Sequence, residues 1–196
     1  MKQKNTMIVM MGGPGTGKGT FSRMLREMNP DFKYIDTGAI LRSLPPESEI
    51  RKIIAGGNLL PDETVSKIVG DAIDGMTGNV ILDGFPRSVG QAEYLIKNYA
   101  DKYDVHVLFL NARDDVMKKH IIKRRNEGSG RQDDSSEDII NTRIAAFHKT
   151  TMPAIKWIGS NAKDVRFRDV DSNCEERENF ARVLKALRLE KVNPGR

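Results

Sequence analysis

The sequence contains a single cysteine, Cys174, so an internal disulfide bond is excluded and a reducing compartment is indicated. No apolar run approaches the ~20 residues that a membrane-spanning helix needs, and the polar start, MKQKNTM, does not resemble a secretory signal peptide. Internal repeats, low-complexity tracts and a Pro/Gly-rich linker are also absent. These absences argue against a disulfide-stabilised scaffold, a membrane protein and a repeat array. We expect a soluble protein of the cytoplasm with no membrane partner.

The formal net charge is +5, and one segment carries an excess of the same size. Residues 118–131 hold six Lys or Arg and one acid, Glu127. Nucleic-acid binding through this segment is one interpretation, and it would give an affinity that falls steeply with salt. No Phe, Tyr or Trp lies within the segment to stack on bases. We therefore expect a small polyanion, rather than nucleic acid, to bind here.

Five short apolar runs alternate with segments that suit helices. The runs cover residues 7–11, 33–36, 80–83, 105–110 and 165–170. Strands that alternate with helices form parallel sheets covered on both faces, so the pattern predicts an α/β fold. The length of 196 residues and the hydrophobic content of 38% fit one domain spanning residues 1–196.

Two helix starts are predicted from the capping-box pattern, in which Ser or Thr precedes an acidic residue by three positions. Ser172 and Glu175 predict the start of the last helix, whose apolar residues recur at helical spacing from Phe180 to Leu187. Ser135 and Asp138 predict the start of a long helix that ends near residue 157.

A glycine-rich loop, GGPGTGKGT, follows the first apolar run at residues 12–20. Glycines at alternate positions let the backbone curl so that successive N–H groups face the oxygens of a phosphate. The helix start adds partial positive charge, and Lys18 can reach the β- and γ-phosphates. Gly19 follows the lysine where Ser or Thr is usual, and Thr20 comes next. The motif predicts a nucleotide phosphate site.

A second motif, ILDGFPRS, covers residues 81–88. Its strand ends in Asp83, which we expect at the carboxyl edge of the sheet beside the glycine-rich loop, where α/β proteins bind ligands. A carboxylate there can hold Mg²⁺ through water. Gly84 permits close approach of the backbone, and the planar guanidinium of Arg87 can bind a phosphate at two points.

Four motifs, GGPGTGKGT, DTGAILR, ILDGFPRSVGQAE and GSGRQDD, occur in this order. Together they resemble the adenylate kinases of the nucleoside monophosphate kinase family, from residue 7 to about residue 180. The resemblance implies transfer of the γ-phosphoryl group of ATP to AMP with Mg²⁺, giving two ADP. It also implies a P-loop NTPase-type five-stranded parallel sheet with helices on both faces. A small insertion at about 36–65 would bind the nucleoside monophosphate, and a short lid would span about 125–134. The lid has no cysteine cluster, so no structural zinc is expected.

The same resemblance assigns site residues. The ATP site would comprise Gly13, Gly15, Thr16, Gly17, Lys18, Gly19, Thr20, His120 and Arg124. The AMP site would comprise Thr37, Arg42, Asn58, Leu59, Leu60, Gly84, Phe85, Pro86, Arg87, Gln91, Arg131 and Arg143. Catalysis would depend on Lys18, Arg87, Arg124, Arg131 and Arg143, and the magnesium on Asp83 through water, with Thr20 as a further ligand. These charges suit a reaction that requires alignment and neutralisation of several phosphates.

The chain departs from the family pattern at several positions. His120 stands where the family usually has an arginine over the ATP adenine, which leaves the choice of purine donor open. Ala39 replaces a common aspartate, Phe21 replaces a common glutamine, and the segment between Arg42 and Gly57 is shorter than usual. These changes leave the phosphate-binding residues in place and bear on the shape of the acceptor site.

Two alternatives remain beside the adenylate kinase interpretation. A UMP/CMP kinase would usually lack Thr37 and carry Asn near Gln91, so these two residues favour AMP. A nucleotide-binding regulator that had lost turnover would be expected to have lost its phosphate-binding cations, which this sequence retains. Members of the family are commonly monomers, and we expect a monomer.

Overall fold

The computed structural model describes residues 4–55, 59–127 and 136–189. Its centre is a parallel sheet of five strands in the order β2-β3-β1-β4-β5. The strands are β1 (Asn5–Gly12), β2 (Lys33–Asp36), β3 (Val80–Asp83), β4 (Tyr103–Asn111) and β5 (Val165–Asp171). The predicted parallel α/β fold and the positions of all five strands are confirmed, with differences of at most two residues at the strand ends.

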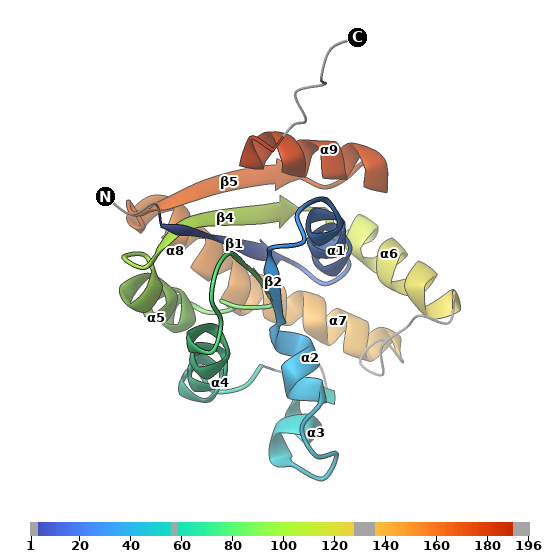
Figure 1. Ribbon diagram of the computed structural model, residues 1–196. Helices are drawn as coiled ribbons and strands as arrows, with labels where there is room; N and C mark the ends of the chain where they lie inside the picture. The colour runs from blue at the N-terminus through green and yellow to red at the C-terminus, as the bar shows by residue number, and fades with distance from the viewer. Residues whose placement is uncertain (1–3, 56–58, 128–135, 190–196) are drawn as a thin grey trace.

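Helices cover both faces of the sheet (Figure 1). One face packs against α1 (Lys18–Met28) and α9 (Glu176–Leu187). The core of the other face includes residues of α4 (Asp62–Asp74), α5 (Val89–Tyr99), α6 (Asp114–Asn126), α7 (Glu137–Ala146) and α8 (Met152–Asn161). Strand β1 shows the alternation that a doubly covered sheet requires, since Met7 and Val9 join one core and Ile8 and Met10 join the other.

Two short helices extend away from the sheet after β2. Helix α2 (Thr37–Arg42) begins at the N-cap Asp36, whose side chain accepts a hydrogen bond from the Ala39 N–H. Helix α3 (Glu49–Ala55) has no buried residue and lies at the foot of Figure 1, away from the sheet.

Both capping-box predictions were wrong about the capping residue. Helix α9 has Glu175 as its N-cap, and the Ser172 hydroxyl instead donates to the Thr16 carbonyl oxygen at 3.2 Å. Helix α7 is capped by Ser136, which accepts from the Ile139 N–H at 3.3 Å, whereas Ser135 lies outside the described residues. Both N-cap residues have extended backbone geometry, but only Ser136 uses its side chain to accept a hydrogen bond from the helix.

The long helix predicted to end near residue 157 is not one regular helix. A π-helical turn, η2 (Phe147–Thr151), separates α7 from α8, and α8 continues to Asn161. Within the described ranges, no helix combines the length and the apolar character needed to cross a membrane.

Candidate active site

The glycine-rich loop connects β1 to α1, and Gly12, Gly15 and Gly17 in it all have positive φ. Gly15 has φ 80° and Gly17 has φ 88°. A Cβ atom on Gly15 would lie 2.5 Å from the Met117 carbonyl oxygen in α6, so the loop also needs the missing side chain to pack against that helix. Gly17 is the N-cap of α1 and offers no side-chain acceptor. The first N–H groups of α1 are therefore available to an anion at the positive end of the helix.

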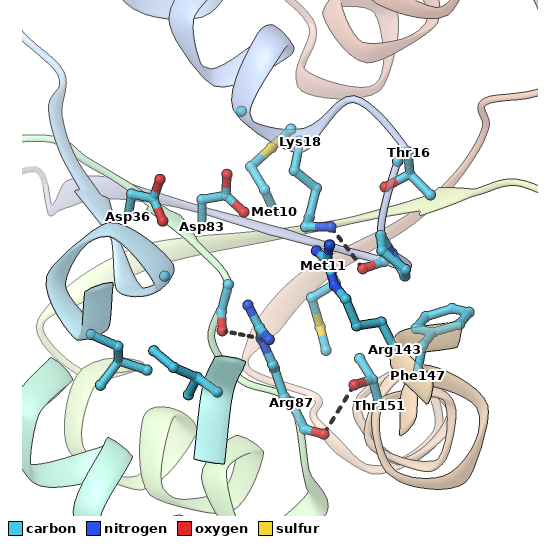
Figure 2. A pocket seen from close by; sticks show the side chains of 18 of the residues that line it. Met10, Met11, Thr16, Lys18, Asp36, Asp83, Arg87, Arg143, Phe147 and Thr151 are labelled. Carbon is cyan, nitrogen blue, oxygen red and sulfur yellow. Dashed lines mark hydrogen bonds between the residues drawn. The ribbon is translucent and has the colours of Figure 1, made fainter. Parts of the chain in front are cut away.

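Lys18 lies across the loop. Its Nζ donates to the carbonyl oxygens of Gly12 at 2.9 Å and Gly13 at 2.7 Å, and Figure 2 draws one bond from Lys18 to this loop as a dashed line. The Thr16 side chain is turned into the loop, where its hydroxyl donates to the Gly13 oxygen at 2.9 Å. The loop therefore has a fixed shape that places one ammonium group at its opening.

The loop forms one wall of a cavity of about 440 Å³. Seven cationic side chains line this cavity: Lys18, Arg23, Arg42, Arg51, Arg87, Arg124 and Arg143. Two acidic side chains, Asp36 and Asp83, line it as well. Figure 2 shows Lys18 and Arg143 approaching each other from opposite sides of this space, with Arg87 beneath them. A chamber with this excess of positive charge suits a ligand with several phosphate groups.

Asp83 ends β3 and faces the start of α1. Its side chain is buried, and burial raises the pKa of its carboxyl group, an effect that the neighbouring Lys18 charge opposes. Tyr34 donates a hydrogen bond to Asp83 Oδ2 at 3.1 Å. Asp36 is the register partner of Asp83 on β2, and Figure 2 shows the two carboxylates side by side. A magnesium ion fits this edge of the sheet, because hard oxygen ligands are gathered there and Thr20 lines the same cavity.

Arg87 follows β3 and is held from two directions. Its Nε donates to the Gly84 carbonyl oxygen at 2.8 Å, and its own carbonyl accepts from the Thr151 hydroxyl at 3.1 Å.

Nearby, the Thr37 side chain is almost fully buried, and its hydroxyl oxygen has no hydrogen-bond partner among the described residues. A buried hydroxyl without a partner is costly, so a ligand that bonds to Thr37 would be favoured.

Two further predicted residues lie just behind the cavity wall. The Gln91 side chain is buried at the start of α5 and bonds to both Arg87 and Asp62. His120, on α6, approaches the glycine-rich loop, with its Nδ1 2.9 Å from the Gly15 carbonyl oxygen. Since a carbonyl oxygen only accepts, His120 carries a proton on Nδ1 in this arrangement.

The structure brings most of the predicted residues to one cavity. Those that line it are Gly15, Thr16, Gly17, Lys18, Gly19, Thr20, Arg42, Leu59, Asp83, Gly84, Pro86, Arg87, Arg124 and Arg143. Those that do not are Gly13, Thr37, Leu60, Phe85, Gln91 and His120, although several of these contact residues that do. Asn58 and Arg131 lie outside the described residues.

Three charged residues of the cavity wall were missed from the sequence. Arg51 lies on α3, and Arg51, Ile54 and Ala55 all line the cavity. Their helical spacing in the sequence could have predicted that they share one face of a helix. Arg51 Nη1 donates to the Arg42 carbonyl oxygen. Arg23, on α1, carries no comparable signal. Asp36 was treated only as a strand end, and its proximity to Asp83 follows from the strand register.

Comparisons of the sequence with known proteins point to one family. The family model described as adenylate kinase matches residues 10–163. The chain is 37% identical over 165 residues to an adenylate kinase of Phocaeicola vulgatus, covering 80% of this chain and 86% of the relative. It is 34% identical over 192 residues to one of Parabacteroides distasonis, covering 92% and 96%, and 33% identical over 165 residues to one of Encephalitozoon cuniculi, covering 82% and 87%. The chain therefore belongs to the adenylate kinase family.

Proposed function

We propose that this enzyme transfers the γ-phosphoryl group of Mg-ATP to AMP and releases two ADP. The observation that carries the proposal is the convergence of the glycine-rich loop and seven cationic side chains on one cavity. The donor phosphates would lie on the loop and the first N–H groups of α1. The acceptor phosphate would lie against Arg87 and Arg42, with its nucleoside toward Thr37, residues 58–60 and Gln91.

The chemistry requires no protein nucleophile. A phosphate oxygen of AMP attacks the γ-phosphorus of ATP, and the bond between that phosphorus and the β,γ-bridging oxygen breaks, leaving ADP on each side. The protein aligns the two phosphate chains and neutralises charge on the oxygens of the group in transit. Lys18, Arg87, Arg124 and Arg143 would do this, since all four line the cavity.

Magnesium, when bound with ATP, would supply further neutralisation of the phosphate oxygens. Asp83 would hold it through water, and Thr20 is available as a further oxygen ligand. Burial raises the pKa of Asp83, and the positive charge of Lys18 lowers it. A divalent cation would lower it in the same way and so favour the ionised carboxylate.

Two segments would complete the site when substrates bind. Residues at about 36–65, which include α2 and α3, would form the acceptor side, and residues at about 125–134 would form a short lid that carries Arg131. Arg131→Ala should lower kcat more than it weakens ATP binding, because its contact would belong to the closed state. An unchanged kcat would contradict the lid assignment.

We also propose a monomer of the cytoplasm, a location supported by the single cysteine.

The direct test is the stoichiometry of the reaction. With Mg-ATP and AMP present, two ADP should appear for each AMP consumed, as measured by chromatographic separation of the nucleotides. A nucleotide-binding regulator without turnover would bind ATP and form no ADP. Hydrolysis alone would give one ADP and free phosphate and leave AMP unchanged.

A further inference from the structure

The carboxamide of Gln91 is held at both of its ends. Its Oε1 accepts from the Arg87 backbone N–H at 2.7 Å, and its Nε2 donates to Asp62 Oδ1 at 3.0 Å. The backbone N–H of Gln91 donates to the hydroxyl of Ser88, the N-cap of α5, at 3.1 Å. The side chain is almost completely buried, with an exposed fraction of 3%. The amide therefore has little freedom to rotate.

These two partners allow only one orientation of the amide. The Arg87 N–H can only donate, and an ionised Asp62 carboxylate can only accept. Rotating the amide by half a turn would place Nε2 against a donor and Oε1 against an acceptor. Both hydrogen bonds would be lost and replaced by repulsions. After the two bonds are made, one N–H and one oxygen lone pair of Gln91 remain for a ligand.

A fixed amide distinguishes the two kinds of purine edge. Adenine presents an acceptor at N1 and a donor at its 6-amino group, which match an amide N–H and an amide oxygen. Hypoxanthine presents a donor at N1 and an acceptor at O6, so it matches the same amide only after a half turn. A free glutamine could rotate to suit either base, whereas one held by Asp62 favours adenine.

We propose that Asp62 is a specificity-determining positioning residue, which holds the Gln91 amide in the orientation that accepts adenosine and rejects 6-oxopurine monophosphates. This inference rests on the proposed function, in which the acceptor base lies against Gln91. The Gln91 amide bonds directly to the backbone of Arg87, which lines the cavity, so the held amide adjoins the acceptor side of the site.

A substitution at Gly90 tests the contact between Asp62 and Gln91 without changing either residue. A Cβ atom at this position would lie 2.7 Å from Asp62 Oδ2. Gly90→Ala would therefore displace the carboxylate of Asp62 without altering its chemistry. Gly90 lies inside α5 and its φ is not positive, so alanine is the better helix former there. A loss of selectivity in this variant could not be attributed to weakening of the helix.

The experiment compares kcat/KM for AMP and IMP, with saturating Mg-ATP, in the wild type and three variants. IMP changes the N1 and 6-position pattern and adds no 2-amino group. Asp62→Asn keeps the shape of the side chain, but its amide can accept or donate, so one of the two constraints on Gln91 is lost. The ratio of kcat/KM for AMP to kcat/KM for IMP should fall about tenfold in Asp62→Asn, the loss expected for about one hydrogen bond. The same ratio should also fall in Gly90→Ala.

Glu63→Gln is the matched control, because it removes the neighbouring carboxylate from the same first turn of α4. Its AMP to IMP ratio should stay at the wild-type value. An unchanged ratio in Gly90→Ala and in folded Asp62→Asn would overturn the inference and leave the proposed function intact. A wild type that prefers CMP or UMP to AMP would overturn the proposed function and, with it, this inference.

Discussion

Lys18 is the residue on which the phosphate chemistry depends most directly. Its ammonium group already lies against the carbonyl oxygens of Gly12 and Gly13, at the opening of the glycine-rich loop. Lys18→Met keeps most of the length of the side chain and removes the charge that would stabilise the transferring phosphate. We expect kcat to fall by about 100-fold or more, and the free energy of unfolding to change by no more than about 1 kcal/mol.

Steady-state kinetics and thermal unfolding of the same preparation measure both effects. Lys185→Met, at an exposed position on α9, is the control and should retain wild-type turnover. Near-normal turnover by a folded Lys18→Met variant would contradict the assignment of the loop.

At this scale, the sequence predicted residues whose signal is local. The spacing of glycines identified the loop and Lys18, and a strand ending in Asp-Gly identified Asp83. It did not predict the cavity role of Arg23, because that depends on where α1 lies relative to helices distant in the chain. Nor did it predict that Tyr34 would bond to Asp83, since that contact joins two strands.

Among the secondary-structure elements, the π-helical turn η2 connects two parts of the cavity wall. It separates Arg143, on α7, from Thr151, whose hydroxyl bonds to the Arg87 carbonyl. Deleting the exposed Lys149 would remove the extra residue, so the turn would close as a regular α-helix and the backbone that carries Phe147 and Thr151 at the cavity wall would shift. We expect kcat to fall by about tenfold or more, because a misplaced catalytic group costs at least that much.

Lys149→Ala, which keeps the length of the turn, should have near wild-type kcat. Circular dichroism and thermal unfolding would establish that the deletion variant is folded. Full activity in a folded deletion variant would show that the turn does not position Arg143.

An exposed ion pair joins β4 and β5. Arg166 donates a hydrogen bond to Asp104 at 2.9 Å across these strands, and this bond holds the pKa of Asp104 below its ordinary value of 3.8. A carboxyl group whose pKa is lowered by folding stabilises the fold at every pH above its ordinary pKa. This contribution is lost as the pH falls through the lowered pKa. The effect is small, because both side chains are substantially exposed.

Asp104→Asn should therefore lower the melting temperature near neutral pH and make no difference in strong acid. Thermal unfolding of both proteins from pH 7 to about pH 2.5 measures this. Arg166→Gln should show the same loss near neutral pH. A constant difference between wild type and Asp104→Asn at every pH would contradict the ionic origin of the effect.

The helix boundaries show what short motifs leave undetermined. The sequence does contain the Ser-x-x-acid pattern at Ser172. The Ser172 hydroxyl nevertheless bonds to the glycine-rich loop and does not cap the helix. A capping motif competes with tertiary partners, and those are not visible in a short window. The π-helical turn was missed for a related reason, since one inserted residue hardly changes helical spacing.

Taken as a whole, the molecule concentrates charge at the point where the strand order changes direction. Strands β1 and β3 are central neighbours, and their carboxyl ends carry the glycine-rich loop and Asp83. Alternation of apolar runs with helical segments was sufficient to predict the parallel sheet. The assembly of all seven cations from α1, α2, α3, α6, α7 and the loop after β3 was not derivable from periodicity, and only the family resemblance anticipated part of it.

The central claim is that the acceptor side of this cavity is built for adenosine monophosphate. Steady-state kinetics with Mg-ATP and a panel of AMP, CMP, UMP, GMP and IMP tests it most directly. Buried Thr37 and the held amide of Gln91 predict that kcat/KM for AMP exceeds that for either pyrimidine by at least about tenfold, or about 1.4 kcal/mol of differential transition-state binding. A preference for CMP or UMP, or the absence of phosphoryl transfer to any of the five, would contradict the claim.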